Sequence, residues 1–443
     1  MGLSLQATID NALAETPPGR VVWVALSGGL DSSLLLRLAA EACRRPPRPL
    51  HALHVHHGLQ AAADGFESHC RRLCSHLGVP LFVERVAVDL AAGQGLEGAA
   101  REARYAAFAR RVAPGETLWL AQHRDDQAET FLLAALRGSG VRGLAGMPAT
   151  RVWRERRLER PLLPVSREAL EDEAARCGFA WVEDPSNADE GLDRNYLRHC
   201  LMPGLTARWP HAVAALSRSA ALAGEAEGLL GELAELDLER LGDEAERLPI
   251  AKLAALSRPR QRLLVRHACA QRALPTPPAT RLATLLAQLD ARADGETRVV
   301  WPGAEARLWR GVLHLMAPPP ALPADWERHW DGMAPLTTPL GICAVGLAGP
   351  PEARGGVVLR ARRGGERLRL AGRGSRDLKR LLQELDVPPW RRQRLLVVWH
   401  AGRSGAETPV ALLDPLAGRW LALAEGWRSH EGAAISRGKP AAC

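Results

Sequence analysis

The stretch Ser27-Gly28-Gly29-Leu30-Asp31-Ser32-Ser33 decides the fold of the first part of the chain. It follows a short apolar run, residues 21–26, which predicts a buried strand. It precedes the leucine-rich residues 34–40, which predict a helix capped by Ser32 or Ser33. The two glycines therefore lie in a strand-to-helix turn, where backbone N–H groups and the helix dipole bind anions, above all phosphate. Without a Cβ, they allow the backbone to approach a phosphate closely.

This turn differs from the common nucleoside-triphosphate loop. The pattern Gly-x-x-x-x-Gly-Lys-Ser/Thr occurs nowhere in the sequence, so the phosphate-binding lysine of that loop is missing. The pattern Ser-Gly-Gly-x-Asp-Ser is similar instead to the pyrophosphate loop (PP-loop) of ATP pyrophosphatases, which split ATP between the α and β phosphates and adenylate an oxygen of the substrate. The alternative is a turn without a ligand, but six specified residues in a strand–turn–helix context favour the phosphate site.

The composition of the whole chain is that of a soluble globular protein. Its 443 residues are 47% hydrophobic and 24% charged. The net charge of +8 indicates an anionic partner such as nucleic acid, with a genomic bias towards arginine as the alternative. Eight cysteines form no Cys-x-x-Cys pair, which argues against zinc, redox and iron–sulfur sites. We expect reduced, buried cysteines, a cytoplasmic location and no membrane span, since no signal peptide or long apolar run is present.

Short apolar runs alternate with helical patterns from residue 20 to about residue 137. This alternation predicts βαβ units and a parallel sheet covered on both faces. Ligands of such sheets bind at the carboxyl ends of the strands. We expect further strands at 50–55, 81–88 and 117–121, and helices at 64–77, 96–112, 125–137 and 166–177.

Histidines and arginines follow two of these elements. The strand 50–55 runs into His54-Val55-His56-His57, where His54 and His56 share a face and His57 points away. We favour a polar strand end lining a nucleotide site over a metal cluster, because no cysteine or carboxylate nearby completes a ligand set. Glu97, Arg101 and Arg104 share one helix face. They form either a solvated, salt-bridged face or a clamp for polyphosphate or carboxylate.

An acidic block follows the strand 117–121. It reads His123-Arg124-Asp125-Asp126-Gln127-Ala128-Glu129-Thr130, and Asp126 and Glu129 are neighbours in the first turn of a helix. Helix capping is one explanation. Three acids beside His123 exceed what a cap requires, and they suit Mg²⁺ on ATP or the ammonium group of a substrate.

Two further motifs come later in the domain. Gly138–Gly143 matches the dinucleotide fingerprint Gly-x-Gly-x-x-Gly, but it follows a helix and not a strand, so we predict a flexible loop near the active site. The turn sequence Asp184-Pro185-Ser186-Asn187 precedes Arg194 and Arg198, which share a helix face and could contact phosphate.

Together these blocks resemble one family, the tRNA(Ile)-lysidine synthetases. The Ser27–Ser32 loop alone is typical of the superfamily. The combination of His-x-Asp-Asp-Gln-Ala-Glu-Thr with Asp-Pro-Ser-Asn and Arg-Asn is specific to the family. The family often has a histidine where this chain has Gln122. The matching stretches are Ser27–Ser32, His54–Leu59, Glu97–Tyr105, His123–Thr130, Arg137–Gly143, Arg160–Leu163 and Glu183–Arg198.

The resemblance implies a reaction in two steps. ATP adenylates the C2 oxygen of the wobble cytidine of tRNA(Ile) with a CAU anticodon, and the ε-amine of free L-lysine then displaces AMP to give lysidine. The codon read changes from AUG to AUA and the tRNA identity from Met to Ile. The implied catalytic residues are Asp31, Arg104, Asp126 and Glu129, with Asp31 and Asp126 also as Mg²⁺ ligands. The implied lysine-binding residues are His123, Asp126 and Glu129. The implied ATP-binding residues are Ser27, Gly28, Gly29, Leu30, Asp31, Ser32, His54 and His56.

The second half of the chain loses the βα rhythm. Helical patterns at 212–241, 253–274 and 280–291 predict a module that recognises tRNA, or alternatively a dimerisation bundle that would make the protein a homodimer. Residues 351–400 carry 13 Lys and Arg against 5 Asp and Glu, and they resemble the C-terminal tRNA-binding domain of longer family members. Trp390 among arginines favours a nucleic-acid surface over a solvated basic face. The candidate tRNA-binding residues are Arg194, Arg198, Lys379, Arg380, Arg391 and Arg392.

We therefore expect an α/β catalytic domain of the PP-loop ATP pyrophosphatase class at residues 1–211. A helical tRNA-recognition domain at 212–317, a linker at 318–340 and a basic α+β C-terminal domain at 341–443 follow it. One rival function is that of a tRNA thiolase, which would need catalytic or cluster-binding cysteines, typically Cys-x-x-Cys. A second rival function is that of an inactive tRNA-binding module. The intact acidic and glycine-rich blocks argue against it.

Overall fold

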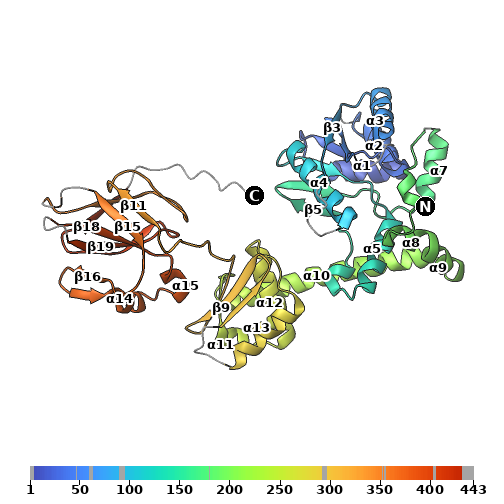
Figure 1. Ribbon diagram of the computed structural model, residues 1–443. Coiled ribbons are helices and arrows are strands. Elements are labelled where there is room, and N and C mark those ends of the chain that lie inside the picture. The colour runs from blue at the N-terminus through green and yellow to red at the C-terminus, as the bar shows by residue number, and fades with distance from the viewer. Residues whose placement is uncertain are drawn as a thin grey trace. The chain divides into compact units, whose positions relative to one another are not determined.

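The structure is a computed structural model. It describes residues 4–45, 47–58, 63–88, 95–178, 180–291, 297–351, 353, 356–402 and 406–431. The chain divides into two compact units, residues 1–233 and 234–443, with the boundary inside the long helix α10 (Ala212–Leu241) (Figure 1).

A six-stranded sheet with strand order β3-β2-β1-β4-β6-β5 forms the centre of the first unit. Five strands run parallel, and β5 pairs with β6 in antiparallel fashion at the edge. The predicted parallel sheet is thus confirmed. The strands are β1 (Val22–Ala25), β2 (Leu50–His56), β3 (Leu81–Arg85), β4 (Thr117–Trp119), β5 (Thr150–Trp153) and β6 (Arg156–Glu159).

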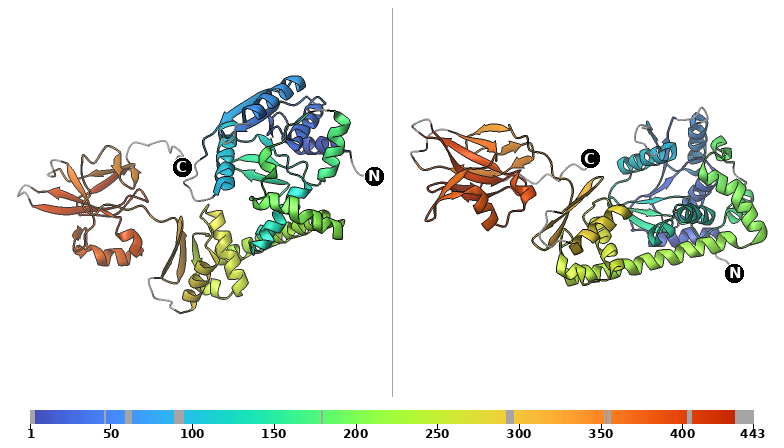
Figure 2. Two further views of the ribbon diagram at one scale, coloured as in Figure 1. Left: turned by 45° about the vertical axis from the view of Figure 1, so that its right-hand side comes forward. Right: turned by 60° about the horizontal axis from the view of Figure 1, so that its bottom comes forward.

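Helices cover this sheet on both faces (Figure 2). Val22 and Val24 of β1 belong to one apolar core, whereas Trp23 between them belongs to a second core on the other face. The helices of the unit before α10 are α1 (Leu5–Glu15), α2 (Leu30–Ala42), α3 (Ala63–Leu77), α4 (Gly95–Arg111), α5 (Arg124–Leu136), α6 (Val141–Leu144), α7 (Arg167–Cys177), η2 (Pro185–Ala188), α8 (Asp193–Tyr196), η3 (Leu197–Leu201) and α9 (Met202–Arg208).

Two local predictions in this unit are wrong. Gly29, and not a serine, is the N-cap of α2, because the Ser32 hydroxyl turns back to the loop and contacts Ser27. The segment Gly138–Gly143 is not only a loop. Gly138 has a positive φ of 67°, which ends α5 sharply, and the chain then forms the short helix α6 with Gly140 as its N-cap.

The second unit begins with helices on an antiparallel sheet. Two of the predicted helices are present as α12 and α13, but the segment also contains a four-stranded sheet with order β7-β10-β9-β8 that the sequence analysis missed. Its strands are short, and charged residues interrupt the apolar ones in β8 and β9, so their apolar pattern is weak. The elements are β7 (Arg247–Pro249), α11 (Ile250–Ala254), α12 (Arg258–Gln271), α13 (Ala279–Ala291), β8 (Arg298–Trp301), β9 (Ala304–Trp309) and β10 (Val312–Met316).

The rest of the unit is built on a five-stranded antiparallel sheet with order β11-β15-β18-β19-β20. Residues 318–340, which we expected to be a linker, contain the strands β11 and β12. The elements are β11 (Glu327–Trp330), β12 (Leu336–Thr338), β13 (Gly341–Cys343), β14 (Val345–Ala348), β15 (Val357–Ala361), β16 (Arg367–Leu370), β17 (Gly374–Asp377), α14 (Leu378–Glu384), α15 (Pro389–Arg392), β18 (Leu396–Ala401), β19 (Glu407–Asp414), β20 (Arg419–Leu423) and β21 (Arg428–Glu431).

The described cysteines are all free thiols. Most of them are buried as expected, but Cys177 is only partly buried and Cys200 is exposed. Within the described ranges, no helix is both long and apolar enough to cross a membrane.

Candidate active site

The loop between β1 and α2 is braced by two serine hydroxyls. The Ser32 Oγ accepts a hydrogen bond from the Ser27 backbone N–H at 3.1 Å and lies 2.9 Å from the Ser27 Oγ. It also donates to the Gly29 carbonyl at 3.2 Å. Because these contacts join the two ends of the turn, the backbone N–H groups at the start of α2 are held in a fixed arrangement.

Gly28 is the residue of this loop at which a side chain would be strained. Its φ is +95°, and a Cβ built there would lie 3.3 Å from the Sγ of buried Cys70. Gly29 has an ordinary φ of −73°, and a Cβ there would have only contacts of 3.6 Å or more. The two adjacent glycines therefore have different roles in the loop.

We expect Gly28→Ala to lower the free energy of unfolding by about 2 kcal/mol, because alanine is strained at a positive φ. Gly29→Ala is the matched control and should cost less than about 1 kcal/mol, the difference between glycine and alanine at an N-cap. Urea unfolding followed by circular dichroism measures both. Equal losses in the two variants would contradict this account of the loop.

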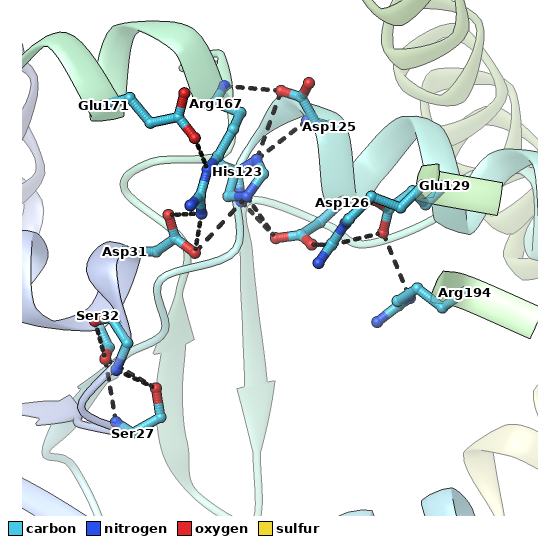
Figure 3. A network of polar contacts seen from close by, with 12 residues as sticks. Ser27, Asp31, Ser32, His123, Asp125, Asp126, Glu129, Arg167, Glu171 and Arg194 are labelled. Carbon is cyan, nitrogen blue, oxygen red and sulfur yellow. Dashed lines mark hydrogen bonds and ion pairs between the residues drawn. The ribbon is translucent and has the colours of Figure 1, made fainter. Parts of the chain in front are cut away.

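Acidic side chains surround His123 at the carboxyl end of β4. His123 is the N-cap of α5: its Nδ1 lies 3.3 Å from the Asp125 backbone nitrogen and 3.5 Å from Asp125 Oδ2, and its backbone N–H donates to Asp126 Oδ2 at 3.1 Å. Its Nε2 lies 3.5 Å from Asp126 Oδ2 and 3.9 Å from Asp31 Oδ2 (Figure 3). The residues that cap α5 are therefore the same ones that form the acidic cluster. Through His123, this cluster brings Asp31 of the glycine-rich loop close to Asp126.

Three arginines pair with these acids. Arg167 Nη1 donates to both carboxylate oxygens of Asp31 at 2.7 and 3.0 Å. Arg198 donates to both oxygens of Glu129 at 2.8 and 3.0 Å and to Asp126 Oδ1 at 3.2 Å.

Arg194, the third arginine, forms an ion pair with Glu129 at 3.5 Å and donates to the Thr130 hydroxyl at 3.0 Å. Arg194 and Arg198, which we predicted as tRNA contacts, thus bind side chains of α5. Arg167 is not among the predicted site residues, because it belongs to no motif. It starts α7 directly after the N-cap Ser166.

A cavity of about 660 Å³ opens beside this cluster. Residues from the loop, β2, α4, α5 and the 184–194 segment line it, so the separate sequence motifs meet at one place. His123, Glu129, Gly28, Leu30 and Arg198 do not line it. The lining includes the predicted site residues Ser27, Gly29, Asp31, Ser32, His54, His56, Arg104, Asp126 and Arg194.

Burial and charge shift the pKa values of this cluster. Burial raises the pKa of Asp31, and the negative charge of nearby Asp126 raises it further. The positive charges of His123 and Arg167 lower this pKa, but the net shift is upward. Burial also raises the pKa of Glu129, which is only 2% exposed, despite its pairing with Arg198. For His123, burial lowers the pKa, but Asp125, Asp126 and Asp31 outweigh it and the net shift is upward. The site therefore favours a cation.

The histidines at the end of β2 have separate partners. His54 Nδ1 lies 2.8 Å from the Leu26 carbonyl, and His56 Nε2 lies 3.2 Å from Asp64 Oδ1. His57 also lines the cavity, which corrects the expectation that it points away, because β2 ends at His56 and the alternation stops there. In the part of the chain that the structure describes, no group of three or more His, Cys, Asp or Glu side chains is arranged to hold a metal ion.

The predicted basic residues of the C-terminal region differ in exposure. Lys379 and Arg380 are exposed on α14, whereas Arg391 and Arg392 are partly buried on α15. Arg392 Nε donates to the Val387 carbonyl at 2.7 Å. The expectation of a surface ring at Trp390 is wrong: this side chain is 8% exposed because it packs against Trp309 and His314.

Comparison with known proteins decides the family. Residues 1–205 match the PP-loop domain, residues 248–314 the TilS substrate binding domain and residues 357–404 the TilS substrate C-terminal domain. The tRNA(Ile)-lysidine synthase of Xanthomonas axonopodis pv. citri is 45% identical over 88% of this chain and 89% of its own length. That of Pseudomonas aeruginosa is 45% identical over 94% of this chain and 96% of its own length.

The chain belongs to the tRNA(Ile)-lysidine synthase family. Its PP-loop domain and this membership make it an ATP-dependent ligase. The residue Gln122, where the sequence departs from the histidine frequent among lysidine synthases, lines the cavity. Its Oε1 is buried and has no hydrogen-bond partner among the described residues.

The raised pKa of His123 predicts how the stability of the protein depends on pH. Because the folded-state pKa lies above the ordinary value of 6.5, protonated His123 stabilises the fold fully below about pH 6.5. This stabilisation is lost as the pH rises through the folded-state pKa. The free energy of unfolding in urea should therefore fall less between pH 6 and pH 8 in His123→Gln than in the unmodified protein.

The matched control is His76→Gln, which removes an exposed histidine of α3. It should leave the pH dependence as it is in the unmodified protein. A His123→Gln variant with the same pH dependence as the unmodified protein would show that His123 does not carry the charge inferred for it.

Proposed function

We propose that the cavity binds ATP, L-lysine and the wobble cytidine of tRNA(Ile) with a CAU anticodon, and that the chain joins lysine to C2 of that cytidine. The observation that carries the proposal is the convergence of two motifs: Asp31 of the PP-loop and Asp126 of the acidic block line the same cavity. ATP activation and amine binding can therefore occur next to each other.

The first step makes the cytidine reactive. The C2 oxygen attacks the α-phosphorus of ATP, a P–O bond forms, and pyrophosphate leaves with the electrons of the broken α–β bond. The helix N-terminus at Ser27–Ser32 offers N–H groups to the charged phosphates. Arg104 lines the same cavity and can bind a phosphate or the lysine carboxylate. An oxygen that is a poor leaving group has then become part of AMP.

The second step forms the C–N bond. The neutral ε-nitrogen of lysine attacks C2, AMP leaves with the C2 oxygen, and the nitrogen releases one proton to the solvent. The amine must be neutral to attack, although its ordinary pKa is about 10.4. We propose that Asp126 binds lysine through an ammonium group. His123 and Glu129 then act through Asp126, since His123 bonds to it directly and Glu129 shares Arg198 with it.

Mg²⁺ fits the two carboxylates that face the cavity. Asp31 and Asp126 offer the hard oxygen ligands that Mg²⁺ prefers beside nucleotide phosphates. When bound, the ion would neutralise phosphate charge. We also propose that the basic C-terminal region, including exposed Lys379 and Arg380, contacts the tRNA. We also propose that the reaction takes place in the cytoplasm, where tRNA and ATP are available.

The test combines ATP, labelled lysine and unmodified tRNA(Ile) transcript with the purified protein. We expect lysine to enter the tRNA with one AMP formed per lysine, and no incorporation without ATP. Asp31→Ala should abolish incorporation while the variant stays folded. Binding of the tRNA without any lysine incorporation would overturn the proposal and favour a tRNA-binding module.

A further inference from the structure

An arginine cluster lies at the edge of the cavity, outside the machinery described above. Arg101, Arg151 and Arg160 surround Tyr105, and we call these three arginines the Tyr105 cluster. Arg101 Cζ lies 5.0 Å and Arg151 Cζ 5.7 Å from the centre of the Tyr105 ring. Arg101 and Tyr105 also line the cavity. The cluster thus joins the active site to the surface of α4 and β5.

The charges of the cluster are not neutralised within the described residues. No carboxylate there forms an ion pair with any of the three arginines. Arg160 is only 4% exposed, its Nη1 donates to the Pro148 carbonyl at 2.8 Å, and its Nε has no hydrogen-bond partner. Burial lowers the pKa of Arg160, and so do the like charges of Arg151 and Arg101. Tyr105 raises this pKa, but the net shift is downward. Such an arrangement is costly unless an anion joins it.

The hairpin that carries Arg151 is fixed in place. Arg156 Nη2 donates to the Ala109 carbonyl at 2.8 Å, so β6 is tied to the C-terminal end of α4. The Trp153 ring meets the Tyr105 ring edge-on at 5.3 Å. Arg151 is exposed on the edge strand β5, and the tip beyond it carries Arg154. The positive charge therefore continues from the cavity onto an exposed surface, where an extended polyanion can follow it.

We propose that the Tyr105 cluster binds a backbone phosphate of the RNA strand next to the nucleotide in the cavity. The inference rests on the proposed function for the identity of that RNA. A backbone phosphate suits the cluster better than a phosphate of ATP. The PP-loop after β1 provides for ATP, whereas Arg151 lies on the edge strand β5, three strands away from β1. Arginines supply the charge, and aromatic rings hold their guanidinium planes in position.

The test measures binding of an unmodified tRNA(Ile) transcript, and of its isolated anticodon stem-loop, to the full chain at several salt concentrations. We expect Arg151→Ala to weaken both about fivefold and to reduce the slope of log affinity against log salt by roughly 0.7, the loss of one phosphate contact on a single strand. Arg151→Lys should restore most of the slope. The matched control Arg72→Ala removes an exposed arginine from α3, at the other edge of the sheet. It should change neither the RNA affinity nor the salt slope.

Affinity for a non-hydrolysable ATP analogue separates the two sources of phosphate. It should be unchanged in Arg151→Ala. Weaker analogue binding with an unchanged salt slope for RNA would overturn the proposal and assign the cluster to the nucleotide. Unchanged RNA binding in Arg151→Ala would also overturn it. Absence of lysine incorporation by the unmodified protein, with the RNA effects intact, would count against the proposed function alone.

Discussion

Asp126→Asn should lower the rate of lysine incorporation into tRNA(Ile) roughly a hundredfold or more, the size of effect seen when a positioned catalytic group is lost. Asp126 is the carboxylate of the acidic block that faces the cavity. Asparagine keeps an oxygen that can accept the bond from the His123 N–H, so the cap of α5 survives while the negative charge is lost. Initial rates with labelled lysine measure the effect.

The control for this variant is Asp172→Asn, which neutralises an exposed acid on α7. It should keep the full rate. Circular dichroism should show that Asp126→Asn melts like the unmodified protein. If Asp126→Asn retained its rate within a factor of three while folded, Asp126 would not be the group that binds the lysine ammonium.

Arg198→Met should destabilise the fold by about 3 kcal/mol, since it leaves the buried carboxylate of Glu129 without its principal partner. The double variant Arg198→Met/Glu129→Met should recover most of this loss, because an apolar pair of similar size replaces the ion pair. Activity should stay low in both variants, because Arg198 also holds Asp126. Urea unfolding and the lysine assay give the two readouts.

A surface ion pair provides the comparison for this experiment. Arg137 and Asp193 form one at 3.2 Å, and both side chains are largely exposed. Arg137→Met should therefore change stability by less than about 1 kcal/mol. The prediction fails if Arg198→Met/Glu129→Met is no more stable than Arg198→Met. In that case the buried charge of Glu129 would not depend on Arg198 for its stabilisation.

The sequence predicted the catalytic fold well because its signals are local. The apolar runs of β1, β2 and β4 are short and bounded, and the polar motifs follow each of them directly. The rule that ligands bind at the carboxyl ends of parallel strands then placed Asp31, His54 and Asp126 at one cavity.

Contacts between distant segments could not be predicted in the same way. Arg167 pairs with Asp31, which lies 136 positions earlier in the sequence, and no sequence pattern around Arg167 predicts this contact. His123 and Glu129 share a motif with Asp126, but only the packing shows that they lie behind it. Trp390 illustrates the same limit, because flanking arginines indicate a surface whereas its ring is buried against another segment.

The most direct test of the account is the mass of the tRNA fragment that carries the wobble cytidine, after incubation with ATP and L-lysine and digestion by ribonuclease. We predict a gain of one lysine minus one water on that cytidine alone, dependent on ATP and absent with Asp126→Asn. An unchanged fragment mass, from folded protein that binds both ATP and the tRNA, would contradict the central claim that this cavity joins lysine to tRNA.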